Sequence, residues 1–95
     1  MARQSTDAVG ILCEGTMRAA ALIIQSRHID HRALDPDCTR ITAALRQTLR
    51  ENLEATLEEW REALDARPGE AWLRELLNAQ CNSLALKALE SLGWL

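Results

Sequence analysis

The sequence predicts an all-α domain in which three main helices form a bundle. The chain has 95 residues, enough for one domain with a modest core. Leu and Ala are its commonest residues, and both favour helix. It contains no Phe or Tyr and few β-branched residues, which strands prefer. Apolar residues recur at steps of three and four along most of the chain, which is the period of an amphipathic helix.

The first predicted helix runs from about residue 7 to about residue 27. Ser5, Thr6 and Asp7 offer side-chain oxygens that can cap the backbone N–H groups at a helix start. Gly10 and Gly15 each weaken a helix by about 1 kcal/mol relative to Ala. We interpret them as a weak first half of the helix, the alternative being close approach of another helix. The inward face is predicted to be Val9, Leu12, Thr16, Ala19, Ala20, Ile23 and Ile24.

The second predicted helix runs from about residue 36 to about residue 66. Asp35 is its expected N-cap and Pro36 its first helical residue, with Thr39 as an alternative cap. One apolar stripe follows the whole helix and consists of Ile41, Leu45, Leu49, Leu53, Leu57, Trp60 and Leu64. Its mean step of about 3.8 residues exceeds the helical period of 3.6, so the stripe drifts around the helix. This drift argues against a simple left-handed coiled coil.

The third predicted helix runs from about residue 70 to about residue 92. Pro68 cannot continue the second helix, Gly69 supplies turn geometry, and Gly93 stops the third helix. Because the connection is short, we expect the second and third helices to form an αα-hairpin with the first packed across it. The third helix presents Leu73, Leu77, Cys81, Leu84, Ala88 and Leu92 on one face, widened by Leu76, Leu86 and Leu89.

Helix lengths predict self-association. The second helix would span about 45 Å, and its partners are shorter, so part of its stripe would stay uncovered at the Ile41 end. A two-fold homodimer through helix faces is the simplest closure. Trp60 and Trp72 flank the hairpin turn, where they either fill the core or anchor a partner. The predicted partner interface consists of Ile41, Leu45, Leu49, Trp60, Trp72, Trp94 and Leu95. Trp94 and Leu95 are expected to dock on their own bundle, on a dimer mate or on a partner protein.

The segment from residue 27 to residue 38 is the only chemically suggestive cluster. His28 and His31 are three apart and would share a face of a helical turn. Together with Asp35 or Cys38 they are weak candidates for binding zinc or a similar ion. No ExxH pair, second HxxH or CxxC completes a ligand set, so we expect a solvated linker with no metal and no cofactor.

Catalysis has little support in the sequence. Cys38 lies near a predicted helix N-terminus, which can lower the pKa of a thiol, whereas Cys13 and Cys81 lie on apolar faces. No residue pattern supplies an oxyanion hole or a third orienting group, and there is no GxGxxG or Walker motif. We therefore expect a protein that is not an enzyme. The three cysteines are odd in number and widely spaced, which is typical of free thiols in a cytoplasmic protein.

Charge and hydropathy narrow the function further. The net charge is −3, and the arginines alternate with glutamates, which is typical of a solvated helix surface rather than a phosphate track. No apolar run reaches the length of a membrane span, and charges interrupt the N-terminal apolar stretch, so a cytoplasmic location is expected. The preference for Arg over Lys suggests a GC-rich bacterial genome.

The sequence thus predicts a small regulatory or adaptor protein that binds a partner protein through helix faces, for example as an anti-activator, immunity protein or co-chaperone. One alternative is a regulator that contacts nucleic acid through Arg40, Arg46 and Arg50, which lie at roughly helical spacing. A second alternative is a metal-binding helical protein that uses His28 and His31.

Overall fold

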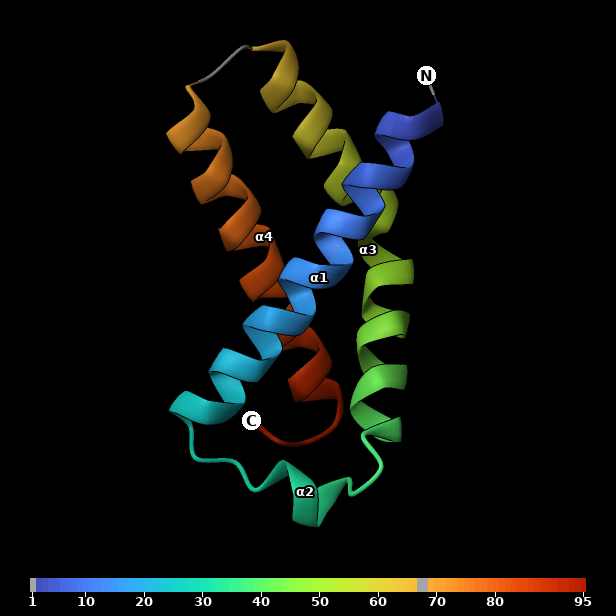
Figure 1. Cartoon of the computed structure of the whole chain (residues 1–95), viewed down its shortest axis with the longest axis vertical. Helices are drawn as coiled ribbons and strands as arrows, with labels where there is room; N and C mark the ends of the chain where they lie inside the picture. The colour runs from blue at the N-terminus through green and yellow to red at the C-terminus, as the bar shows by residue number, and fades with distance from the viewer. Residues whose placement is uncertain (1, 67–68) are drawn as a thin grey trace.

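The all-α prediction is confirmed across the part of the chain that the structure describes. The structure, a computed structural model, describes residues 2–66 and 69–95, with side chains described at 9–63, 65–66, 69 and 71–95. These residues form four helices and no strand (Figure 1). The helices are α1 (Ala2–Ser26), α2 (His31–Leu34), α3 (Thr39–Asp65) and α4 (Glu70–Ser91). Three of them match the predicted main helices.

Two helix starts differ from prediction. Helix α1 begins at Ala2, so Ser5, Thr6 and Asp7 lie inside the helix instead of capping it. Their side chains lie outside the described residues. Ala2, Arg3 and Gln4 are good helix formers, which explains why the helix extends past the expected cap. Helix α3 begins at Thr39 instead of Pro36, because Cys38 has a left-handed φ of 55° that no helix can include.

Helices α3 and α4 form the predicted antiparallel hairpin. They run in opposite directions and are joined at one end of the molecule, while α1 crosses them (Figure 1). Of the predicted Pro68–Gly69 turn, Pro68 lies outside the described residues. Gly69 has extended backbone angles, and its carbonyl accepts the first helical bond of α4 from the Leu73 N–H at 3.2 Å. The short connection therefore gives the topology that the sequence predicts.

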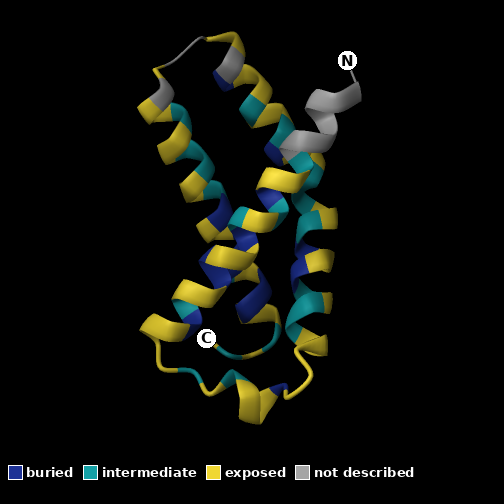
Figure 2. Ribbon diagram, in the orientation of Figure 1, coloured by how far each residue is buried: buried dark blue, intermediate teal, exposed yellow. Residues whose placement is uncertain are grey.

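Helix α4 is the central helix of the bundle. It packs against both α1 and α3, whereas the contact between α1 and α3 is smaller. The buried apolar residues are Leu12, Ala19, Ala20 and Ile24 from α1, Leu45 and Ala63 from α3, and Cys81, Leu84, Ala85, Ala88 and Leu89 from α4 (Figure 2). The inward face predicted for the first helix is confirmed, with Val9 and Ile23 half-buried at its edges. Many of these side chains are small, so the helices approach closely.

Gly15 lies where α1 closely approaches Cys81 of α4. A Cβ atom built on Gly15 would lie 2.5 Å from Cys81 Sγ, whereas one built on Gly10 would have nothing within 4 Å. The interpretation of both glycines as a weak helix half is therefore wrong for Gly15. At that position a hydrogen in place of a side chain makes room for the Cys81 thiol.

The apolar stripe of α3 is only partly buried. Leu45 is its one buried member among the described side chains, and the side chain of Leu64 lies outside them. Ile41, Leu49, Leu53, Leu57 and Trp60 are all half-buried. Thr48, Thr56 and Ala63 are buried instead. These five side chains pack against the core but remain partly exposed, so partial exposure extends along most of the helix and is not confined to the Ile41 end, where the sequence predicted it.

The molecule is elongated and thin. Its principal extents are 44 × 25 × 17 Å and its radius of gyration is 14.2 Å, against about 12 Å for a compact chain of this length. It exposes 6867 Å² of surface, whereas a compact monomer of 10.6 kDa exposes about 5,500 Å². This shape leaves apolar side chains exposed.

Candidate interaction groove

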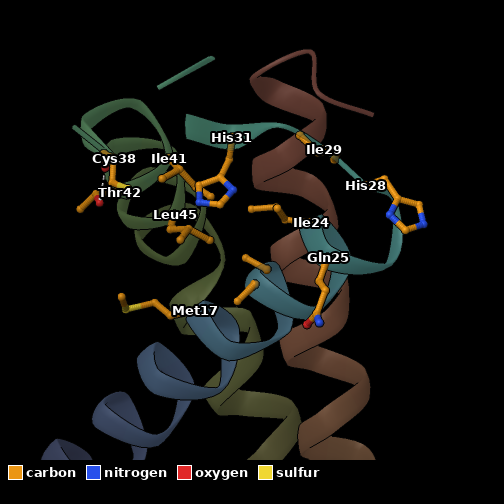
Figure 3. Close-up of a pocket in the computed structure, with 12 residues that line it drawn as sticks. Met17, Ile24, Gln25, His28, Ile29, His31, Cys38, Ile41, Thr42 and Leu45 are labelled. Carbon is orange, nitrogen blue, oxygen red and sulfur yellow. Dashed lines mark hydrogen bonds between the residues drawn. The ribbon is translucent and has the colours of Figure 1, made fainter. Parts of the chain in front are cut away.

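A groove of about 430 Å³ lies where α1, α2 and α3 meet. Helix α1 forms one wall, the start of α3 forms the other, and the segment that carries α2 closes one end (Figure 3). The lining residues are Met17, Ala20, Ala21, Ile24, Gln25, His28, Ile29, His31, Cys38, Ile41, Thr42 and Leu45. None of them is Asp, Glu, Lys or Arg. Its volume lies within the range of about 300–1,000 Å³ that is usual for binding pockets.

The end of α1 shapes one side of the groove. The Ile29 N–H donates to the Ile24 carbonyl at 3.1 Å and the His28 N–H donates to the Gln25 carbonyl at 3.2 Å. These two bonds form a Schellman motif, in which the residue at the His28 position takes a left-handed conformation. His28 has a φ of 54°, in the place where glycine is usual. The motif turns the chain sharply and brings Ile29 back beside Ile24 in the groove wall.

Asp35 fixes the start of α3 on the other side. Its carboxylate is buried, and it accepts the backbone N–H of Thr39 at 3.1 Å and of Ile41 at 2.9 Å. Burial alone would raise the pKa of Asp35, but the N–H groups of Ile41, Arg40 and Thr39, together with the Arg40 charge, outweigh burial and lower this pKa below its ordinary value. The prediction that the Asp35 side chain caps the start of this helix is confirmed. The prediction that Asp35 stands directly before the first helical residue is wrong, because the carboxylate reaches the helix from four residues before Thr39.

The two histidines do not share a helical face. His28 follows the end of α1 in a left-handed conformation, and His31 begins α2, so the predicted common turn is wrong. Figure 3 shows the His31 ring beside Ile41, whereas the His28 ring extends away from it on the other side of Ile24. Asp35 uses both carboxylate oxygens on α3. Within residues 2–66 and 69–95, no group of three or more His, Cys, Asp or Glu is placed to hold a metal ion.

The three cysteines are free thiols in different environments. Cys38 is exposed and lines the groove, Cys13 is half-buried and Cys81 is buried. Burial raises the pKa of Cys81, and the neighbouring Thr16 hydroxyl lowers it in part. Thr16 is itself fully buried, and its Oγ1 makes no hydrogen bond with any described residue. Cys81 and Thr16 are therefore part of the core where α1 meets α4, and the thiol is held in its neutral form.

The tryptophans have different surroundings. Trp60 is half-buried and packs against the core, whereas Trp72 is 49% exposed near the hairpin end, so core filling is wrong for Trp72. Trp94 is half-buried. Its backbone N–H donates to the Leu89 carbonyl at 3.1 Å, so the segment after α4 turns back towards that helix. Leu95 is 41% exposed. Of the predicted interface, Ile41 and Leu45 line the groove, while Leu49 and the three tryptophans lie outside it.

The arginines proposed to contact nucleic acid are exposed but do not form a basic surface of their own. Arg40, Arg46 and Arg50 are all exposed on α3. Acidic residues follow directly on the same helix, where Glu51, Glu54 and Glu58 are also exposed. Such mixed charge gives little of the continuous positive potential that phosphate backbones require.

Several groove and surface residues were not singled out from the sequence. Met17, 57% exposed, and Ala21 line the groove from α1, outside the inward face predicted for that helix. Ile11 and Leu22, 44% and 60% exposed, lie elsewhere on α1. Their sequence signal is an excess of apolar residues outside the inward set, which an amphipathic helix that faces water would not have.

Comparisons with known proteins give no further guidance. No protein-family model, curated protein or solved structure matches the chain significantly. Among the described residues, no helix has the length and apolar character needed to cross a lipid bilayer.

Proposed function

We propose that this chain is a small non-enzymatic interaction protein that regulates or adapts a partner protein by binding it through helix faces. The observation that carries the proposal is the exposed surface of 6867 Å². It exceeds by about 1,400 Å² the area of a compact protein of this mass. A standard protein–protein interface removes about 800 Å² from each partner. The excess is therefore large enough for one such interface.

The character of the exposed surface supports the same proposal. Met17 and Leu22 on α1 and Trp72 on α4 are each about half or more exposed, which leaves large apolar side chains open to contact with a partner. Met and Trp are among the residues enriched at protein interfaces. The simplest partner is a second copy of the chain, because two-fold symmetry closes the assembly with a single kind of contact.

Native mass measurement tests the proposal. We expect untagged protein, analysed by size-exclusion chromatography with light scattering, to have about twice the mass of the 10.6 kDa chain or to elute with a stoichiometric second protein. A monomer that recovers no stoichiometric partner from its native lysate at near-physiological salt would contradict the proposal. A gel-shift assay at low salt serves as a control, because tight binding of DNA or RNA there would favour the nucleic-acid alternative.

A further inference from the structure

We propose that the groove between α1 and α3 is the interface of a homodimer, in which two antiparallel α1 helices cross on a two-fold axis and each Met17 enters the groove of the other copy. This inference rests on the proposed function, since self-association is one form of the proposed helix-face binding. It adds the surface, the occupant and the relative direction of the helices.

The side of α1 that carries Met17 is suited to close contact with another helix. Gly10, Met17 and Ala21 are seven and four residues apart, so they lie on one side of the helix. Gly10 has open space around its Cα, and Ala21 is exposed. Met17 is the one large side chain among the three, and its flexible thioether adapts to the shape of an apolar groove. Two small residues beside one large residue allow a second backbone to come near.

Charge selects a second copy in antiparallel orientation. Glu14 and Arg18 are both exposed, are four residues apart and border the side that carries Met17. Within the described part of the chain neither forms an ion pair. If two α1 helices cross antiparallel near residues 14–18, the two-fold axis brings Glu14 of each copy opposite Arg18 of the other. A parallel pair would bring like charges together, which is unfavourable.

The chain as a whole exposes enough surface for an interface of standard size, and the lining of the groove is free of formal charge. A stable interface needs about 800 Å² from each chain, and the chain exposes about 1,400 Å² more than a compact monomer of its mass. The groove lining carries no Asp, Glu, Lys or Arg that a second copy would strip of water without a partner. The other exposed apolar residues, such as Trp72 near the hairpin end, line no part of the groove.

A charge-swap series tests the interface. The dimer dissociation constant is measured by light scattering over a concentration series for wild type, Glu14→Arg, Arg18→Glu and the double swap. Each single change replaces two attractive contacts by two repulsive ones, so we expect the dissociation constant to rise about tenfold or more. In the double swap the dissociation constant should return towards the wild-type value. Met17→Glu should weaken the dimer about 100-fold or more, because it places a charge in an apolar groove. Glu75→Arg, a charge reversal at an exposed position of α4 outside the groove, is the matched control and should leave the dissociation constant unchanged. Trp72→Glu tests the exposed Trp72 as a competing contact.

The outcomes separate this interface from the proposed function. If the wild type is a dimer, and Trp72→Glu dissociates it whereas neither single charge change does, the groove interface is wrong and the proposed function still stands. A wild-type monomer bound to a different protein overturns the second copy and still supports the proposed function. A monomer without any partner overturns both. Circular dichroism establishes that each variant is folded, and the two charge positions, being exposed, decide the question if Met17→Glu does not fold.

Discussion

Helices α1 and α4 end in the same kind of turn, but the residue in the left-handed position of that turn is His28 after α1 and Gly93 after α4. Helix α4 ends in a Schellman motif like that of α1, because the Trp94 N–H donates to the Leu89 carbonyl and the Gly93 N–H donates to the Glu90 carbonyl. Its left-handed position holds Gly93, with a φ of 76°, whereas the same position after α1 holds His28. A non-glycine residue in this conformation costs about 1–2 kcal/mol. The α1 end is thus the less favourable of two matched turns.

His28→Gly should stabilise the protein by about 1 kcal/mol, because it removes the steric cost at the left-handed position while the two backbone bonds remain. The melting temperature should rise by about 4–8 °C in thermal unfolding followed by circular dichroism. Gly93→Ala is the matched control and should lower stability by a similar amount. An unchanged or lower melting temperature for His28→Gly would show that the imidazole itself stabilises the fold.

Asp35 gives the protein an acid-sensitive helix start. Because its folded-state pKa lies below the ordinary value, this group stabilises the folded state above that ordinary value, near pH 4. The contribution is lost as the pH falls further, through the folded-state pKa. Urea unfolding between pH 6 and pH 2 should show a smaller loss of stability for Asp35→Asn than for wild type. Equal pH dependence of the two proteins would contradict this role of Asp35.

At neutral pH the Asp35→Asn variant should be less stable than wild type, because an amide has only one oxygen to accept the two N–H groups.

At the scale of helices, the drift of the α3 stripe decides which side chains are buried. Each four-residue step advances about 40° beyond a full turn, so Leu57 lies about 120° from Leu45 around the helix. When Leu45 faces the bundle, the later leucines move to its flank, and Thr48 and Thr56 take the inward positions. Polar contacts then join the hairpin, where Gln80 donates to Glu59 at 2.9 Å and Lys87 donates to Asn52 at 3.1 Å.

The sequence therefore predicted helix positions better than helix faces. The hairpin and the inward face of α1 followed from periodicity and from the Pro68–Gly69 breaker. The drift of the stripe was visible, but its direction relative to α4 depends on packing between helices. The short helix α2 was missed because only the Asp30 side chain, which accepts the Ala33 N–H at 3.3 Å, marks its start. The groove was missed because its walls come from separate segments, and because no glycine marks the left-handed position that His28 occupies.

The contact between α1 and α4 gives a prediction about two glycines. Gly15→Ala should destabilise the protein by about 1–2 kcal/mol despite the better helix propensity of Ala, because its Cβ would lie 2.5 Å from Cys81 Sγ. In the background of Cys81→Ala the same change should cost much less, since the sulfur is then absent. Gly10→Ala meets no atom within 4 Å and should stabilise by about 1 kcal/mol. Urea unfolding of wild type, the two single variants and the double variant measures the coupling between Gly15→Ala and Cys81→Ala. Additive changes in the free energy of unfolding would contradict a close contact between the two positions.

For the whole molecule, thinness and exposed area have a thermodynamic consequence. A chain that buries an excess face only on association gains stability from its own concentration. The molecule is 44 Å long but only 17 Å across in its shortest dimension, a shape with a large surface for its volume.

The melting temperature of wild type should therefore rise with protein concentration. Each tenfold increase above the dissociation constant adds about 1.4 kcal/mol per dimer. Scanning calorimetry from the low micromolar to the near-millimolar range measures this dependence. Met17→Glu should melt at the same temperature throughout that range. A wild-type melting temperature that does not depend on concentration would contradict self-association.

The central position of α4 also bears on how the chain reaches its fold during synthesis. Ala85, Ala88 and Leu89, which are buried where α4 packs, are translated after α1, α2 and α3. At about 5–20 residues per second, α1 waits for several seconds on the ribosome before the helix that covers it has been made. Until then the apolar faces of α1 and α3 are open to chaperones and to nascent chains on neighbouring ribosomes. Because α4 is made after α1, α2 and α3, its synthesis determines when these helices can bury their apolar faces.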